Sequence, residues 1–176
     1  MEDTQFDSCM EKMRAGNKEG LREIYTDYAR YIWSVVYGIV KSKENAEDIT
    51  SEFFIRLWEK ADSYRTGSGH RTYITVMARN MAIDYIRKYG REEASETIEM
   101  TEEIPKESRV EQQVINRMDM EAALKTLNDS ERQIINLKIM GDLTFKEISR
   151  VMKQPMGTVT WKYRNALEKL KRCGYE

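Results

Sequence analysis

The sequence predicts an all-α protein made of two helical domains joined by an acidic linker, the second of which contains a helix-turn-helix. Apolar residues recur three and four positions apart through most of the chain, and no useful length alternates with period two as a strand would. Two prolines and nine glycines leave few breaks in the 176 residues. The helical pattern stops between about residues 91 and 111 and then resumes, which predicts two domains.

The first predicted domain, residues 1–90, contains three amphipathic helices. They run from Leu21 to Val40, from about Lys43 to Lys60 and from about His70 to Tyr89. Each shows an apolar stripe at helical spacing, the mark of a helix that packs one face on a core. The stripe residues are Leu21, Ile24, Tyr28, Ile32, Val35, Val36, Ile39, Ile49, Phe53, Phe54, Leu57, Trp58, Ile74, Met77, Met81 and Tyr85.

Residues 91–111 are predicted to be the linker. They carry eight glutamates against three basic residues, a net charge of −5, and include Pro105. Low apolar content and high charge are typical of an exposed, unpacked segment. Such a linker is commonly only solvated; the alternative is that it keeps the chain off nonspecific DNA or follows a nucleic-acid path through a partner.

The second predicted domain, residues 112–176, contains four shorter helices. Asn128 to Ser130 can cap the second of them, with Ser130 and Gln133 at capping-box spacing, and Thr144 and Glu147 stand at the same spacing. Pro155 suits the first turn of the last helix, where its missing N–H is not needed. The four helices are expected at about 112–127, 130–140, 144–152 and 156–173.

The segment "LTFKEISRVMKQPMGTVTWKYRNALEKLKR" has the form of a helix-turn-helix, two helices separated by a very short turn. In the second helix one stripe is apolar and a neighbouring stripe is expected to be exposed. Trp161 lies on the exposed stripe, where a tryptophan is available to touch a thymine methyl or a sugar. The apolar stripe is Val159, Tyr163, Ala166, Leu167 and Leu170, and the exposed one is Thr158, Trp161, Lys162 and Asn165.

Charge is concentrated in that helix. Residues 153–172 hold six basic side chains and one acidic, a net charge of +5, although the whole chain has a net charge of −1. Such a stretch predicts a field that attracts phosphates. Gly157 and Thr158 stand where a helix N-terminus can approach a phosphate. A basic amphipathic helix with no DNA role is the alternative.

Other classes of function have little support. Cys9 and Cys173 lie near opposite ends of the chain, so neither a disulfide framework nor a zinc site is suggested, and no cofactor or metal is expected. No leader and no apolar run of about 20 residues stand out, which predicts a cytoplasmic protein. An enzyme built on His70, the only histidine, lacks a nucleophile or metal cluster at recognisable spacing, so we expect no enzyme.

The residues resemble a known family, the bacterial RNA polymerase sigma factors, in particular the small extracytoplasmic-function group. The stretch from "LNDSERQIINLKIM" through "GTV" and its basic helix looks like the family's fourth conserved region. "LREIYTDYARYIWSVVYGIVKSKENAEDITSEFFIRLWEK" and "YITVMARNMAIDYIRK" are similar to the helices of its second region. The resemblance covers nearly everything except the first residues and the linker.

The resemblance implies a promoter-recognition subunit that binds core RNA polymerase and promoter DNA. It would contact the flap of the polymerase and the clamp helices of the largest subunit. The residues implied for the clamp helices are Asp48, Glu52, Phe53, Arg56 and Leu57. The minus ten element would be captured and melted by Gly67, Ser68, Gly69, His70, Arg71, Tyr73, Arg79 and Asn80, with His70 and Tyr73 as stacking surfaces. The minus thirty-five element would be read by Lys146, Pro155, Gly157, Thr158, Thr160, Trp161, Lys162, Arg164 and Asn165.

Two positions depart from the family's usual pattern: Tyr73 stands where tryptophan is common, and Trp161 where small or polar residues are. Because nothing resembles the autoinhibitory region of primary sigma factors, family analogy implies a separate anti-sigma factor. The alternative function is a helix-turn-helix regulator that binds duplex operators without core polymerase.

Overall fold

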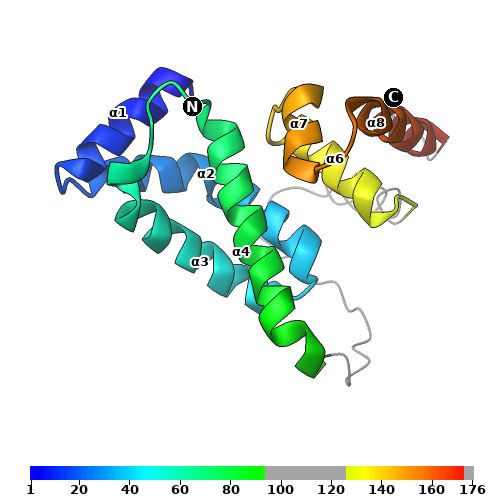
Figure 1. Cartoon of the computed structure of the whole chain (residues 1–176), viewed down its shortest axis with the longest axis horizontal. Helices are drawn as coiled ribbons and strands as arrows, with labels where there is room; N and C mark the ends of the chain where they lie inside the picture. The colour runs from blue at the N-terminus through cyan, green and yellow to red at the C-terminus, as the bar shows by residue number, and fades with distance from the viewer. Residues whose placement is uncertain (94–125, 173–176) are drawn as a thin grey trace, which may run out of the picture.

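The computed structural model describes residues 1–93 and 126–172. Every regular element in those two ranges is a helix, as predicted. None of the described helices is long and apolar enough to cross a membrane. The elements are α1 (Asp3–Arg14), α2 (Glu19–Val40), α3 (Lys43–Glu59), the short 3-10 helix η1 (Ala61–Ser63), α4 (His70–Glu93), α6 (Asp129–Ile139), α7 (Phe145–Met152) and α8 (Met156–Arg172) (Figure 1).

Helices α2, α3 and α4 lie close to their predicted bounds. They pack on one another through buried residues such as Ile32, Phe53 and Ile74, which are each 0% exposed. A buried hydrogen bond of 2.7 Å between the hydroxyls of Tyr31 and Thr75 joins α2 to α4. α4 continues to Glu93, so residues 91–93 of the expected linker are helical. The rest of the expected linker and the helix expected at 112–127 lie outside the described residues, apart from residues 126–127.

Helix α1 was not predicted. Phe6, Cys9, Met10 and Met13 share one face of it and are buried against α2 and the segment that follows α3. A capping box between Glu2 and Gln5 closes its N-terminus, with the Gln5 side chain accepting from the Glu2 amide at 3.0 Å. The apolar spacing is helical over only three turns, which is a weak signal beside the longer helices.

Two of the C-terminal helices, α6 and α7, begin at capping boxes. α6 is capped by Asn128, the first residue of the stretch expected to cap it, and the box is formed with Glu131 rather than by Ser130 and Gln133. The helix starts at Asp129, and the Asn128 side chain accepts from the Glu131 amide at 2.9 Å. α7 is capped by Thr144 and Glu147 as predicted. Pro155 lies immediately before α8, and its carbonyl accepts from the Val159 amide at 3.1 Å.

The two groups of helices, α1–α4 and α6–α8, pack against each other; we call them the N-terminal and C-terminal units (Figure 1). α6 lies along α2, and α7 meets α4. The buried apolar cluster continues across the junction and includes Ile134, Leu137 and Leu143 of the C-terminal unit. The packing is close: a Cβ on Gly141 would lie 2.5 Å from the Tyr31 hydroxyl oxygen. The described parts of the two units therefore form one continuous structure.

Candidate nucleic-acid interface

The helix-turn-helix is made by α7, a short turn and α8. Lys153 adopts a left-handed conformation (φ 52°) at the end of α7, and the Ser149 hydroxyl donates to the Gln154 carbonyl at 2.6 Å. Phe145 packs edge-on against Tyr163, with ring centroids 5.2 Å apart, and this contact sets α7 against α8. The turn and the aromatic pair together fix the direction in which α8 projects.

The N-terminal part of α8 presents an open surface. Trp161 is 64% exposed and Met156 is 54% exposed, as expected for residues off the buried stripe. Lys146 on α7 and Arg164 on α8 are also exposed, as are Pro155 and Gly157, and a Cβ on Gly157 would meet nothing within 4 Å. Thr158 and Thr160 are half-buried, and the Thr160 hydroxyl bonds to carbonyls of its own helix at 3.0 Å.

Two predicted contact residues of α8 are engaged inside the protein instead. The Lys162 ammonium donates to the Ser130 hydroxyl at 2.9 Å and to the Gln154 side chain at 3.0 Å. The Asn165 amide donates to Glu131 at 2.5 Å. Both side chains are half-buried, so in this structure they hold α8 on α6 and do not project from the exposed stripe.

Glu131 is the centre of that attachment. It is 1% exposed, caps its own helix through Asn128, and accepts from Lys169 at 2.8 and 2.9 Å. Burial alone would raise the pKa of Glu131, but the hydrogen bonds from Lys169, the Asn128 amide and Asn165 outweigh burial and lower it. Glu131 is therefore an ionised anchor of the helix-turn-helix. The spacing of Asn128 and Glu131 in the sequence is that of a capping box, and it could have indicated that Glu131 caps α6.

The predicted base-capturing loop lies between η1 and α4. Gly67 and Gly69 both have positive φ, 72° and 82°, and a Cβ on either would meet nothing within 4 Å. Ser68 is exposed beside them.

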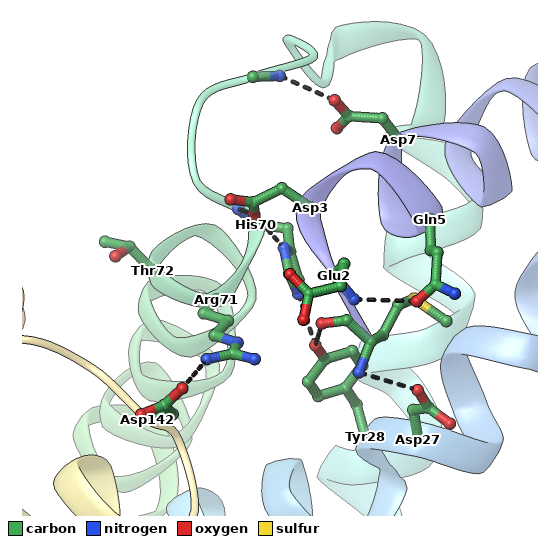
Figure 2. Close-up of polar contacts among 12 residues, drawn as sticks. Glu2, Asp3, Gln5, Asp7, Asp27, Tyr28, His70, Arg71, Thr72 and Asp142 are labelled. Atoms are coloured by element: carbon green, nitrogen blue, oxygen red, sulfur yellow. Dashed lines mark hydrogen bonds and ion pairs between the residues drawn. The ribbon is translucent and has the colours of Figure 1, made fainter.

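His70 begins α4 and is 2% exposed, so its ring offers no surface for a base in this structure. It stacks on Phe6 with centroids 4.5 Å apart, bonds to Asp3 through Nδ1, and lies 2.5 Å from the Tyr28 hydroxyl through Nε2 (Figure 2). Burial lowers the pKa of His70, opposed by the Asp3 carboxylate, whereas the hydrogen bond from His70 lowers the pKa of Asp3. These partners fit a neutral imidazole that donates from Nδ1 and accepts at Nε2.

The remaining minus ten candidates lie along α4. Arg71 pairs with Asp142, and Arg79 donates to the Gln133 side chain at 2.8 Å, so both guanidinium groups face the C-terminal unit. Asn80 is exposed. Tyr73 is half-buried against Tyr64 with ring centroids 5.0 Å apart, and its buried hydroxyl has no hydrogen-bond partner among the residues that the structure describes.

The candidate polymerase-docking face is on α3. Asp48 and Glu52 are exposed, and Arg56 pairs with Glu52 at 3.6 Å in the predicted row. Phe53 and Leu57 are each 0% exposed, because they form the inner face of the helix. Those two residues can support a docking surface but are not part of one in this structure.

Two protein-family models match parts of the chain. A family model described as "Sigma-70 region 2" matches residues 24–92, and one described as "Sigma-70, region 4" matches residues 123–172. The chain belongs to the sigma-70 family, in its extracytoplasmic-function group. Similar curated proteins include the sigma factor SigK of Mycobacterium tuberculosis, 21% identical over 97% of this chain and 94% of that protein, and SigW of Bacillus subtilis, 24% identical over 93% of each.

Solved structures share the fold of this sigma factor. CnrH, in a complex with the cytosolic domain of CnrY, matches with a TM-score of 0.63 at 12% identity over 96% of each chain. RpoE of Bartonella quintana, in a complex with the anti-sigma factor NepR, matches with a TM-score of 0.67 at 21% identity, over 89% of this chain and 96% of that one.

Within the parts of the sigma factor that the structure describes, no three His, Cys, Asp or Glu side chains gather as a metal-ligand set.

The polar network that sequence reasoning missed belongs to α1. Its carboxylates Asp3 and Asp7 bond to the predicted base-capturing loop. Their spacing of four on one helix face was a usable signal, but their partners lie about 60 residues away and the sequence does not indicate them.

Proposed function

We propose that this sigma factor, in the cytoplasm, docks on core RNA polymerase through the exposed row on α3, reads the minus thirty-five element as duplex DNA with α8, and opens the minus ten element with the loop before α4. The observation that supports this most is the surface of α8, where Trp161 projects at 64% exposed next to basic side chains. An exposed helix of this kind fits the major groove.

The phosphate contacts fall to basic residues with exposed side chains. Lys162 and Lys169 are bonded internally, to Ser130 and Glu131. The exposed basic residues of the helix-turn-helix are Lys146, Arg150, Lys153, Arg164, Lys171 and Arg172. Together they supply the sequence-independent part of the binding.

Base capture is assigned to the loop and to Tyr73. The Tyr73 side chain is half-buried and thus more accessible than the His70 ring. Unstacking a base requires a few kcal/mol while stacking on an aromatic ring returns roughly 1–3 kcal/mol. Capture is thus close to balanced, so melting depends on the polymerase as well.

The partner class also includes an anti-sigma factor, since the solved relatives CnrH and RpoE are each in a complex, and the partner of RpoE is named as an anti-sigma factor. No step in this role requires a catalytic residue or a cofactor.

The test is reconstitution with core polymerase, followed by genome-wide sequencing of transcript starts. We expect a shared pair of upstream elements, and no specific initiation without the protein. Tight, specific binding to duplex DNA by the purified protein alone, with no effect on core polymerase, would instead support the operator-binding alternative.

A further inference from the structure

Helix α1 contacts the segment from Ala61 to His70 at three successive points. Arg14 donates to the Ala61 carbonyl at 2.9 Å and to the Tyr64 carbonyl. Asp7 accepts from the Tyr64 hydroxyl at 2.8 Å, and Asp3 accepts from the His70 amide at 3.4 Å and from its ring. The two carboxylates are four residues apart and therefore share a helix face. Figure 2 shows the loop passing over this face.

Asp7 holds the apex of that loop through a side-chain hydrogen bond. One carboxylate oxygen holds the Tyr64 hydroxyl, and the other accepts from the amide of Gly67 at 3.0 Å. Gly67 has a φ of 72°, which turns the backbone at this point. A hydrogen bond that fixes the direction of its N–H therefore also fixes the shape of the loop. The Tyr64 ring is 4% exposed and packs edge-on against Phe6, which ties the start of the loop to the core.

We propose that α1 fixes the conformation of the base-capturing loop and that Asp7 is its positioning residue, through which the loop's selectivity for the minus ten base is set. The inference rests on the proposed role of that loop in base capture. It extends the role beyond residues 24–92, where the region 2 family model matches, to a helix that lies before them.

The physical reason is pre-organisation. A loop with one held shape accepts a base that fits that shape and excludes others, whereas a free loop adapts to several bases and loses conformational freedom with each. Removing the Asp7 carboxylate is therefore expected to weaken capture of the preferred base more than capture of the others. The core contacts of α1 do not depend on this carboxylate, since they are made by Phe6, Met10 and Met13.

The test compares Asp7→Ala with a matched control. Glu11→Ala removes the same charge from an exposed position of the same helix. Each variant is combined with core polymerase, and initiation is measured on the mapped promoter and on templates with single substitutions in the minus ten element. We expect Asp7→Ala to reduce the ratio of preferred to substituted templates by about tenfold, comparable to freeing the backbone of one residue.

A conservative variant separates positioning from charge. In Asp7→Asn the side-chain oxygen can still accept from Gly67, and its amide can donate to the Tyr64 hydroxyl oxygen. That variant, like Glu11→Ala, is expected to keep the ratio within about twofold of the wild type, as for a surface substitution. Tyr64→Phe removes one of the two Asp7 contacts without a cavity, and it replaces Asp7→Ala if the latter does not fold by circular dichroism.

The outcomes are distinguishable. An unchanged template ratio for Asp7→Ala and Tyr64→Phe, or an equal fall for Glu11→Ala, overturns the role of Asp7 while leaving the sigma function intact. A wild-type protein that directs no promoter-specific initiation by core polymerase overturns the proposed function, and this inference with it.

Discussion

At the scale of single residues, several charged side chains that sequence patterns assign to a surface serve the interior. Glu131 is ionised in a site that is 1% exposed, and it is tolerated there because Lys169, Asn165 and the Asn128 amide all donate to it. A buried charge without such partners is strongly destabilising. The orientation of α8 on α6 therefore depends on whether the Glu131 carboxylate is ionised.

This dependence predicts a pH effect. The folded-state pKa of Glu131 is lowered, so its contribution is present above the unfolded pKa and is lost as pH falls through the folded value. We expect Glu131→Gln to reduce the free energy of unfolding by roughly 1–3 kcal/mol at pH 7, and by much less at pH 3. Urea unfolding of both proteins at the two pH values measures the difference.

For a control, Glu168→Gln removes an exposed carboxylate of α8. It should change the unfolding free energy by less than about 0.5 kcal/mol at either pH. A loss for Glu131→Gln that is independent of pH would contradict an ionised Glu131.

A second residue-scale prediction concerns polymerase docking. Glu52 is exposed on α3, so Glu52→Ala should leave helical content unchanged while reducing co-purification with core polymerase. Glu47→Ala is the matched variant, since Glu47 is also exposed on α3 but points about 140° away around the helix axis. Full core binding by Glu52→Ala would remove Glu52 from the docking surface.

At the scale of elements, how well a helix could be predicted depended on the length of its apolar stripe. α2 has 22 residues and α3 has 17, and both were expected within two residues of their bounds. α1 has four buried residues at the same spacing but only 12 residues, and its partners are far along the chain. The apolar stripe did predict that Phe53 is buried, whereas the family resemblance assigned it to the docking surface. The internal role of Lys162 could not be predicted, because the spacing shows which residues share a face, not what covers that face.

The element α8 allows base reading and phosphate binding to be separated. Arg164→Ala should weaken promoter binding by the holoenzyme about equally on all sequences and lower the slope of log K against log salt by about 1. Trp161→Ala should leave that slope unchanged and weaken binding only to promoters with the preferred minus thirty-five element. Fluorescence anisotropy over a salt series distinguishes the two.

Both side chains are exposed, so the free energy of unfolding should change by less than about 0.5 kcal/mol in either variant. Equal, sequence-independent losses for Trp161→Ala and Arg164→Ala would show that Trp161 does not read bases.

At the scale of the whole molecule, the closed packing of the two units conflicts with the proposed simultaneous contact to both promoter elements. A compact chain of 176 residues has a radius of gyration of roughly 16 Å and is about 40 Å across. The two elements are roughly 25 base pairs apart by their names, about 85 Å along the duplex. Arg71 and Arg79, two minus ten candidates, are also occupied by Asp142 and Gln133.

This arrangement could not be predicted from the sequence. Its polar contacts join residues such as Ser34 and Asn136, which are 102 positions apart, with no local pattern to indicate the pairing. Residues 93 and 126 are separated by 32 residues in the sequence, and the greatest length of a chain of 32 residues is roughly 110 Å. That reach is sufficient for the two units to separate and contact both elements.

Separation is therefore expected to be required for initiation, and a cross-link can test it. Ser34 and Asn136 face each other with Oγ and Nδ2 3.1 Å apart, so Ser34→Cys and Asn136→Cys can be joined by a short, reducible bis-maleimide in a Cys173→Ser background. Cys9 should not compete, since burial raises its pKa to about 11 and leaves little thiolate. The linked protein should direct no more promoter-specific transcript than core polymerase alone, and cleavage of the linker should restore it. Each single-cysteine variant treated with the reagent should remain active. Equal transcript from the linked and cleaved forms would show that the units contact both elements without separating.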